Sequence, residues 1–175
     1  DLPVTMDLEG GYGREPEIVA RSVARAIEAG AVGVNVEDQV VGGEGLHDIA
    51  LQGERVAAAA EAIRKSGIGA FLNARTDLFL KTRPDAHDGA LLDQALERAA
   101  VYEKSGADGF FAPGLSDERL IGRLAAETAL PVKFAETIVE ALGREPECPS
   151  DLEGIEKLPQ RVEVMVPDVD AVKRF

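Results

Sequence analysis

The feature that most constrains the fold is a junction between a helix and a strand that occurs three times along the chain. In each copy a helical pattern ends at a glycine, and a short apolar segment follows within a few residues. The three junctions lie at residues 28–38, 65–75 and 104–114. Glycine readily adopts the left-handed conformation with which many helices end. The sequence therefore predicts a series of helix–strand units.

Apolar residues recur at helical spacing along residues 18–27, 56–63 and 92–102. A fourth helix is expected after Ser116, its predicted N-cap, with Leu120, Ile121 and Leu124 turned to the core. Strands are expected at residues 4–9, 32–37, 70–75, 109–112 and 131–135, with a sixth candidate at 162–166. Strands that alternate with helices in this way predict right-handed crossovers and a parallel sheet.

Polar residues occur in pairs, two positions apart, where three of the predicted strands end. The pairs are Asp7 with Glu9, Asn35 with Glu37, and Asn73 with Arg75. Residues two apart on a strand share a face. In a (β/α)8 TIM barrel such side chains converge on one mouth, where the active sites of that fold lie, whereas in an open doubly wound sheet they would spread along an edge. We therefore favour the barrel.

The chain is short for a complete barrel. Its 175 residues hold five or six predicted strands, whereas a typical barrel has eight strands in about 250 residues. We expect residues 1–175 to form a single, incomplete TIM-barrel domain of the α/β class, with the first βα units absent from this chain.

Composition excludes several classes of protein. The chain has 19 Lys and Arg against 32 Asp and Glu, a net charge of −13, which argues against a nucleic-acid partner. No apolar run approaches the roughly 20 residues that span a bilayer, and no secretory leader opens the sequence, so we expect no membrane partner. The single cysteine, Cys148, excludes an internal disulfide and a cysteine metal cage, and it fits a cytoplasmic location.

Three carboxylates at the predicted strand ends suggest a metal site. Asp7, Glu9 and Glu37 offer only oxygen ligands, which favour a hard divalent cation such as Mg²⁺, with Mn²⁺ as an alternative. Arg75 could bind a substrate carboxylate through two N–H groups. Together these residues suit a small 2-oxo carboxylate, whose enolate the metal would stabilise during bond cleavage. The alternative is structural, with the acids capping helices or forming a salt bridge to Arg75.

Four ordered segments resemble the isocitrate lyase and phosphoenolpyruvate mutase superfamily. The segments are Pro3–Gly13, Gly33–Gln39, Asn73–Asp77 and Ala99–Gly109. The resemblance covers residues 1 to about 135, whereas residues 136–175 match poorly. It implies that Asp7 binds the metal, that Glu9 and Glu37 hold the ion directly or through water, and that Arg75 binds the substrate carboxylate. It also implies a homo-oligomer that makes or breaks C–C or P–C bonds.

The chain departs from the better-known branches of that superfamily after Glu37. Residues 40–47 contain neither the cysteine that donates a proton in isocitrate and methylisocitrate lyases nor the lysine and asparagine of phosphoenolpyruvate mutases. Residues 111–115 likewise lack the acid or histidine of those branches. The chain is therefore more similar to a less characterised mutase-family branch.

Three of the four residues at 42–45 are glycine, which predicts a mobile lid over the site. His47, just after this loop, is the predicted proton carrier, because its unperturbed pKa lies near neutrality. The alternative is a solvent-exposed histidine on a mobile loop. Tyr12, Gly13 and Asn73 are predicted to bind substrate, although Tyr12 could instead pack at the barrel rim.

The leading prediction is a Mg²⁺-dependent lyase-type enzyme that acts on a small 2-oxo carboxylate. One alternative is a non-catalytic barrel, a pseudoenzyme that retains the metal site. Another is a class I aldolase in which Lys133 forms a Schiff base.

Overall fold

The computed structural model describes residues 3–128, which form one parallel β-sheet and the helices that connect its strands. The strands are β1 (Thr5–Asp7), β2 (Gly33–Glu37), β3 (Phe71–Arg75) and β4 (Gly109–Phe111). They lie side by side in chain order. The register places Asp7, Asn35, Asn73 and Gly109 in one row across the sheet.

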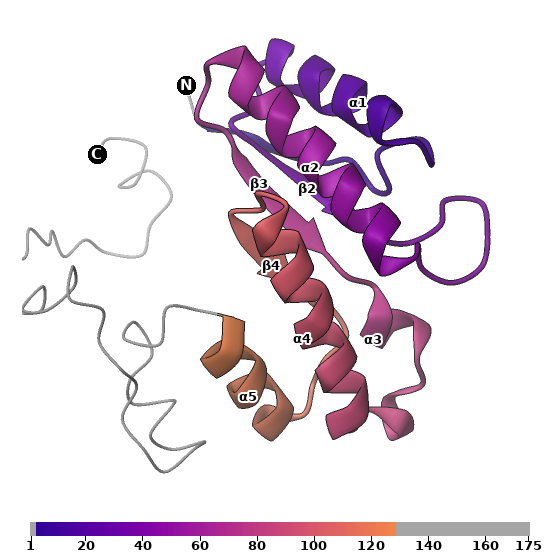
Figure 1. Cartoon of the computed structure of the whole chain (residues 1–175). Helices are drawn as coiled ribbons and strands as arrows, with labels where there is room; N and C mark the ends of the chain where they lie inside the picture. Colours follow the sequence, from indigo (N-terminus) through magenta and orange to yellow (C-terminus); the bar gives the residue numbers. More distant parts are fainter. Residues whose placement is uncertain (1–2, 129–175) are drawn as a thin grey trace, which may run out of the picture.

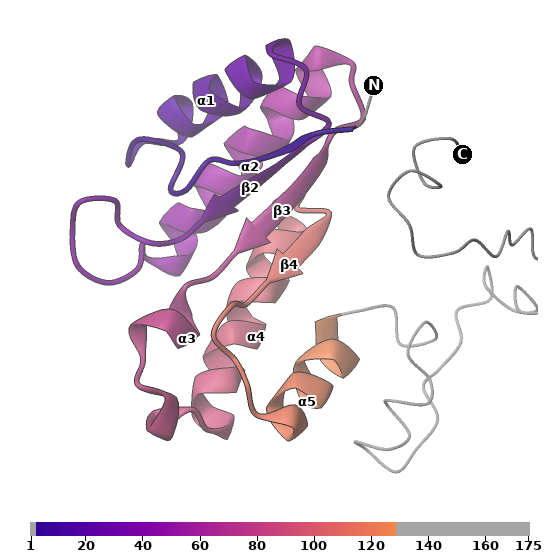
Figure 2. The same ribbon diagram turned by 180° about the vertical axis from the view of Figure 1, so that it is seen from behind.

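The described helices lie between successive strands of the sheet, except the last helix, which follows β4. They are α1 (Pro16–Glu28), α2 (Ile49–Ser66), the short α3 (Leu78–Lys81), the 3₁₀ turn η1 (Pro84–Ala86), α4 (Gly89–Lys104) and α5 (Glu118–Thr128). Helices α1, α2 and α4 lie on one face of the sheet (Figure 1), and Figure 2 shows that no described helix covers the opposite face.

This arrangement decides between the two folds that the sequence allowed. A doubly wound sheet reverses its strand order and carries helices on both faces, whereas the described strands run in chain order with helices on one face. That is the arrangement of consecutive βα units in a (β/α)8 barrel. The expected α/β class is confirmed, and the described residues are part of a TIM-barrel-type fold.

Along β2 and β3, buried apolar residues alternate with residues on the opposite face of the sheet, which separates the core from the polar face. Val34, Val36, Leu72 and Ala74 are buried toward the helices, and α1 packs Val19 against them. Each fully buried valine or leucine side chain contributes about 1.5–3 kcal/mol to folding. The residues between them on the same strands point to the opposite face, which leaves that face for polar side chains.

The helix ends largely follow the sequence signals. Pro16 occupies the first turn of α1, and the glycines that follow α1, α2 and α4 all have positive φ, with Gly67 as the left-handed C-cap of α2. The N-cap prediction for α5 is wrong, because Asp117 rather than Ser116 accepts hydrogen bonds from the first-turn N–H groups. Ile121 is also exposed rather than turned to the core.

The first strand is shorter than predicted. It ends at Asp7, because the chain turns after Leu8, whose carbonyl accepts a hydrogen bond from the N–H of Gly11 at 2.8 Å. Glu9 therefore lies beyond the strand with φ 49°, and the prediction that Asp7 and Glu9 share a strand face is wrong. The predicted strands at 131–135 and 162–166, together with Lys133 and Cys148, lie outside the described residues.

Candidate active site

Arg75 stands at the centre of a cluster of carboxylates at the C-terminal ends of the strands. Its NH1 lies 3.6 Å from Asp7 Oδ2, and its NH2 lies 3.4 Å from Glu37 Oε2. Its Nε donates a 2.6 Å hydrogen bond to Asp77 Oδ1. Strand ends β1, β2 and β3 thus bring three of the predicted site residues, Asp7, Glu37 and Arg75, together around one guanidinium group.

Asparagine side chains extend this polar row across the sheet. Asn35 donates to Asp7 Oδ1 at 3.3 Å, and Asn73 donates to Asn35 Oδ1 at 3.1 Å. The hydrogen bonds follow the register, which places Asp7, Asn35 and Asn73 level on neighbouring strands. The face that the helices leave open therefore carries a continuous polar network that ends at the acidic cluster.

The charges in this cluster perturb each other. Burial raises the pKa of Glu37, and the like charge of Asp77 raises it further, while Arg75 opposes the shift. Burial lowers the pKa of Arg75, but its hydrogen bond to Asp77 and the surrounding carboxylates outweigh this, so the net shift is upward. Arg75 thus stays charged and supplies the positive charge that offsets the crowded carboxylates.

The carboxylate oxygens of the cluster are the ligands that a hard cation prefers, although in the structure they are arranged around Arg75. In the part of the chain that the structure describes, no group of three or more His, Cys, Asp or Glu side chains is arranged to hold a metal ion. Asp7 and Glu37 offer oxygen donors on neighbouring strands, and Mg²⁺ is commonly held by one or two carboxylates and several waters. Asp7 is also half-exposed and within reach of solvent.

The backbone of Glu9 forms hydrogen bonds with both Asp7 and Glu37. Its N–H donates to Asp7 Oδ1 at 2.9 Å, and its carbonyl accepts from the N–H of Glu37 at 2.9 Å. Its charge contributes to the raised pKa of Glu37. The backbone of Glu9 is therefore next to the cluster, on a turn rather than on the strand, and the residue is exposed.

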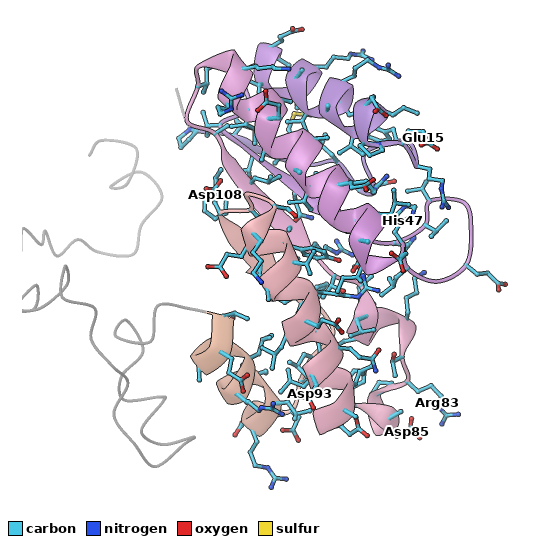
Figure 3. The ribbon with its side chains drawn as sticks, viewed as in Figure 1. Glu15, His47, Arg83, Asp85, Asp93 and Asp108 are labelled. Atoms are coloured by element: carbon cyan, nitrogen blue, oxygen red, sulfur yellow. The ribbon has the colours of Figure 1, made fainter. Side chains whose placement is uncertain are left out.

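The structure brings His47, Tyr12 and Gly13 together in a separate small cavity. They line a cavity of 150 Å³ with Arg14, Val40 and Val41, between the loops that follow β1 and β2. Figure 3 shows His47 on the loop that joins β2 to α2, close to the start of that helix. The predicted site residues thus fall into two groups, one around Arg75 and one around this cavity.

His47 is buried rather than exposed, so the alternative of a solvent-exposed histidine is wrong. Only 4% of its surface is accessible, and its Nδ1 has no hydrogen-bond partner among the described residues. Burial lowers its pKa, and the charges of Arg55 and Arg14 lower it further. The imidazole is therefore held in its neutral form near pH 7.

A buried network behind the cluster was missed by sequence reasoning. Asp38 is fully buried, and its Oδ2 accepts hydrogen bonds from Tyr102 at 2.8 Å and Arg98 at 3.1 Å. Its Oδ1 accepts from the N–H of Asp77 at 2.9 Å, which positions the residue that holds Arg75. The available signal was that Asp38 and Asp77 stand next to or near the predicted site residues in the sequence.

Comparison with known proteins identifies the family to which the chain belongs. The family model described as phosphoenolpyruvate phosphomutase matches residues 1–144. The chain belongs to this phosphoenolpyruvate mutase family. The expected resemblance to the phosphoenolpyruvate mutase and isocitrate lyase superfamily is thereby confirmed.

Relatives of this family member are named as lyases and mutases. A Burkholderia cenocepacia J2315 protein assigned as a phosphonomutase has 48% identity and a TM-score of 0.72, over 75% of this chain and 54% of that one. An oxaloacetate decarboxylase of Bradyrhizobium sp. is 33% identical over 86% of this chain and 48% of its own length. A 2-methylisocitrate lyase of Aeropyrum pernix is 31% identical over 75% and 41%. The chain thus spans about half the length of these relatives.

A second family model matches the other end of the chain. The model described as threonine synthase, C-terminal, matches residues 117–175, so it overlaps the phosphoenolpyruvate mutase match over residues 117–144. A threonine synthase of Methylobacillus glycogenes is 60% identical over 52 residues, which is 30% of this chain and 11% of that enzyme. The C-terminal part of the chain is therefore similar to a different family.

Proposed function

We propose that this chain carries the metal-binding and carboxylate-binding part of a lyase-type or mutase-type active site for a small 2-oxo carboxylate. The observation that supports this most is the convergence of Asp7 and Glu37 on Arg75 at the C-terminal ends of three parallel strands. Relatives with the names oxaloacetate decarboxylase and phosphonomutase support the same substrate class, since oxaloacetate is itself a 2-oxo acid.

Asp7 and Glu37 would hold Mg²⁺, or Mn²⁺ in its place, with Glu9 acting directly or through water. The bound ion would stabilise the negative charge that develops on the oxo oxygen of the substrate as the C–C or P–C bond breaks or forms. The carboxylates fit this role because they are oxygen donors on adjacent strands and repel each other without a cation.

Arg75 would bind the substrate carboxylate. Asp77 holds its Nε at 2.6 Å, which fixes the plane of the guanidinium group. The contacts of NH1 and NH2 to Asp7 and Glu37 are longer, at 3.6 and 3.4 Å. These two nitrogens are the ones that a ligand carboxylate would engage.

Other residues would complete the site. Asn73 would orient the substrate from the polar row, Tyr12 and Gly13 would contact it from the loop after β1, and residues 42–45 would act as the lid. His47 would act as the proton carrier, since its lowered pKa keeps the resting imidazole neutral, which is the form that can accept a proton, and makes the protonated form readier to release it. Assembly into a homo-oligomer and a single barrel-type domain over residues 1–175 remain predictions, and the second family match falls on part of that range. Because the threonine synthase similarity covers only 11% of that enzyme, we do not propose its activity for this chain.

Calorimetric titration with Mg²⁺ followed by oxalate, a mimic of the pyruvate enolate, tests the proposal. We expect the parent chain to bind oxalate only when Mg²⁺ is present, and Asp7→Asn to lose both signals. Asp85→Asn is the matched control, because Asp85 is an exposed acid on η1 (Figure 3) that pairs with Arg83 rather than with Arg75. Equal binding by Asp7→Asn and the parent would refute the metal site. Metal binding without turnover of oxaloacetate would favour the pseudoenzyme.

A further inference from the structure

We propose that the cavity between the loops after β1 and β2 is a subsite for a small oxyanion group, either a carboxylate or a phosphoryl group. Its lining combines Tyr12, Gly13, Arg14 and His47 with two valines. None of these residues is acidic, although the chain carries a net charge of −13. The cavity of 150 Å³ has room for a group of a few heavy atoms rather than a whole cofactor.

Arg55 supplies a buried positive charge directly behind this cavity. Its side chain is fully buried in α2, and it donates hydrogen bonds to the carbonyl groups of Gly10, Gly13 and Arg14 and to the side chain of Gln52. None of the ion pairs among residues 3–128 includes Arg55. The charges of Asp38 and Glu15 act on Arg55, but its hydrogen-bond acceptors are all neutral. Burying a cation in this way is costly, so an anion in the cavity would stabilise it.

The field of Arg55 reaches the cavity. Burial is the largest cause of the lowered pKa of His47, which lines the cavity; the charges of Arg55 and Arg14 lower it further, and the charge of Asp38 opposes them. His47 is itself more than nine-tenths buried and has an unsatisfied ring nitrogen, Nδ1. An oxyanion in the cavity would interact with the positive field of two guanidinium groups and give the imidazole a charged neighbour.

Arg55 also fixes the shape of the cavity wall. By holding three carbonyl groups between Gly10 and Arg14, it pins the loop in which Tyr12 adopts a φ of 63°. Gly10 packs so closely that an added Cβ would lie 2.6 Å from Val41 Cγ2, and Val41 lines the cavity. The two loops are thus held against each other, which fixes the wall of the cavity.

The subsite would hold the second acidic group of a substrate whose first carboxylate binds Arg75. That assignment rests on the proposed function. It is favoured by the position of the two sites, both of which lie where β1 and β2 lead into their loops. Anion binding in the cavity does not depend on Mg²⁺ or on Asp7, so it can be tested separately.

The test is an NMR titration of the ¹⁵N-labelled full chain with inorganic phosphate, and separately with acetate, at constant ionic strength and without Mg²⁺. We expect saturable shifts of the Gly13, Arg14 and His47 amide signals. Arg14→Gln should weaken this binding by about tenfold, as expected for the loss of one charge-assisted contact. Stronger binding of phosphate indicates a phosphorylated substrate, and stronger binding of acetate a dicarboxylate.

Arg64→Gln is the control, because Arg64 is an exposed arginine on the same helix whose side chain pairs with Glu61. Val41→Phe, which fills the cavity without changing charge, should abolish the saturable shifts, and Arg55→Met should do the same if it folds. Asp7→Asn should bind phosphate as the parent does. The subsite is ruled out if the parent shows no saturable shifts with either anion, or if Arg64→Gln loses them as fully as Arg14→Gln.

Discussion

Arg75 shows how much a single residue depends on its surroundings. Its guanidinium group is about one-fifth exposed and has carboxylates on three sides, of which Asp77 makes the closest contact. Asp77 is itself held by the buried Asp38, which accepts its backbone N–H. Arg75 is therefore presented to a ligand in a fixed orientation, and its replacement should affect binding more than that of an exposed arginine.

We predict that Arg75→Met weakens Mg²⁺-dependent oxalate binding by more than about tenfold. The reason is that losing a desolvated charge-assisted pair costs about 2–5 kcal/mol, and tenfold corresponds to about 1.4 kcal/mol. Calorimetry measures the change, with Arg83→Met as the control, because Arg83 is largely exposed and, among residues 3–128, pairs only with the exposed Asp85. Unchanged oxalate affinity in Arg75→Met would remove Arg75 from the site.

The lowered pKa of His47 predicts that the free energy of unfolding depends on pH. Burial and the charges of Arg55, Arg14 and Arg98 lower its pKa in the folded chain, against the opposing charge of Asp38. Because the unfolded chain then binds the proton more readily, stability is highest above the unfolded pKa of about 6.5 and falls as the pH drops below it. We expect the urea midpoint of the parent to fall between about pH 7 and 5.5, and that of His47→Gln to fall less.

Urea unfolding at closely spaced pH values measures this difference. Between about pH 7.5 and 8.5 histidine is neutral in both states, so the parent and His47→Gln should show parallel curves there. Identical slopes for the two proteins below pH 7 would contradict a lowered pKa at His47.

At the level of elements, the loops after β1 and β2 are packed against each other more tightly than their glycine content suggests. Gly10 is buried, and the hairpin-like loop after β2 is closed by the bridge between Gln39 and Leu46. Arg55, from the first half of α2, links this helix to the β1–α1 loop through three carbonyl groups. These loops form the wall of the proposed subsite, so their packing determines its shape.

We predict that Gly10→Ala destabilises the chain by about 1–3 kcal/mol, as is typical of overpacking. The added Cβ would lie 2.6 Å from Val41 Cγ2 and 3.1 Å from the carbonyl oxygen of Gln39. The free energy of unfolding in urea measures the effect. Gly69→Ala is the control, because a Cβ at Gly69 meets nothing within 4 Å, and it should be neutral or slightly stabilising. Equal stability of Gly10→Ala and the parent would show that the two loops separate freely.

At the scale of the whole molecule, long-range polar contacts connect the ends of the strands to the outer helices. Asp38, just after β2, and Tyr102, on α4, are 64 residues apart in sequence and are joined by a 2.8 Å hydrogen bond. Arg98 of the same helix also contacts the carbonyl of His47. These contacts hold α4 against the site end of the sheet, and no local pattern in the sequence indicates them.

Tyr102→Phe should therefore cost about 1–3 kcal/mol of stability, because it leaves the buried Asp38 with one donor fewer at Oδ2. Burial and the charge of Asp38 raise the pKa of the Tyr102 hydroxyl, so it remains a donor throughout the range of a urea experiment. Tyr12→Phe, at a tyrosine that is 62% exposed, should change the free energy of unfolding little. A similar effect of both substitutions would contradict a structural role for the Asp38 network.

The two family similarities cover different, partly overlapping parts of the chain. The described helices and strands belong to the phosphoenolpyruvate mutase match, and α5 lies within residues 117–144, where the two matches overlap. No described helix is long and apolar enough to cross a membrane. The functional proposals use residues of β1, β2 and β3, of the loops that follow these strands, and of α2, and none of them uses a residue of the C-terminal segment.

The sequence by itself determined the order of helices and strands and the polar row at the strand ends. These follow from local rules, since the two-residue period of a strand places Asn35 with Glu37 and Asn73 with Arg75 on one face. Glu9 leaves the strand at a local turn, which the strand pattern alone did not predict. Only the tertiary structure decided that His47 is buried and that Arg55 pins the neighbouring loop. Such features arise where separate segments meet, and burial and electrostatic shifts depend on those neighbours rather than on local sequence.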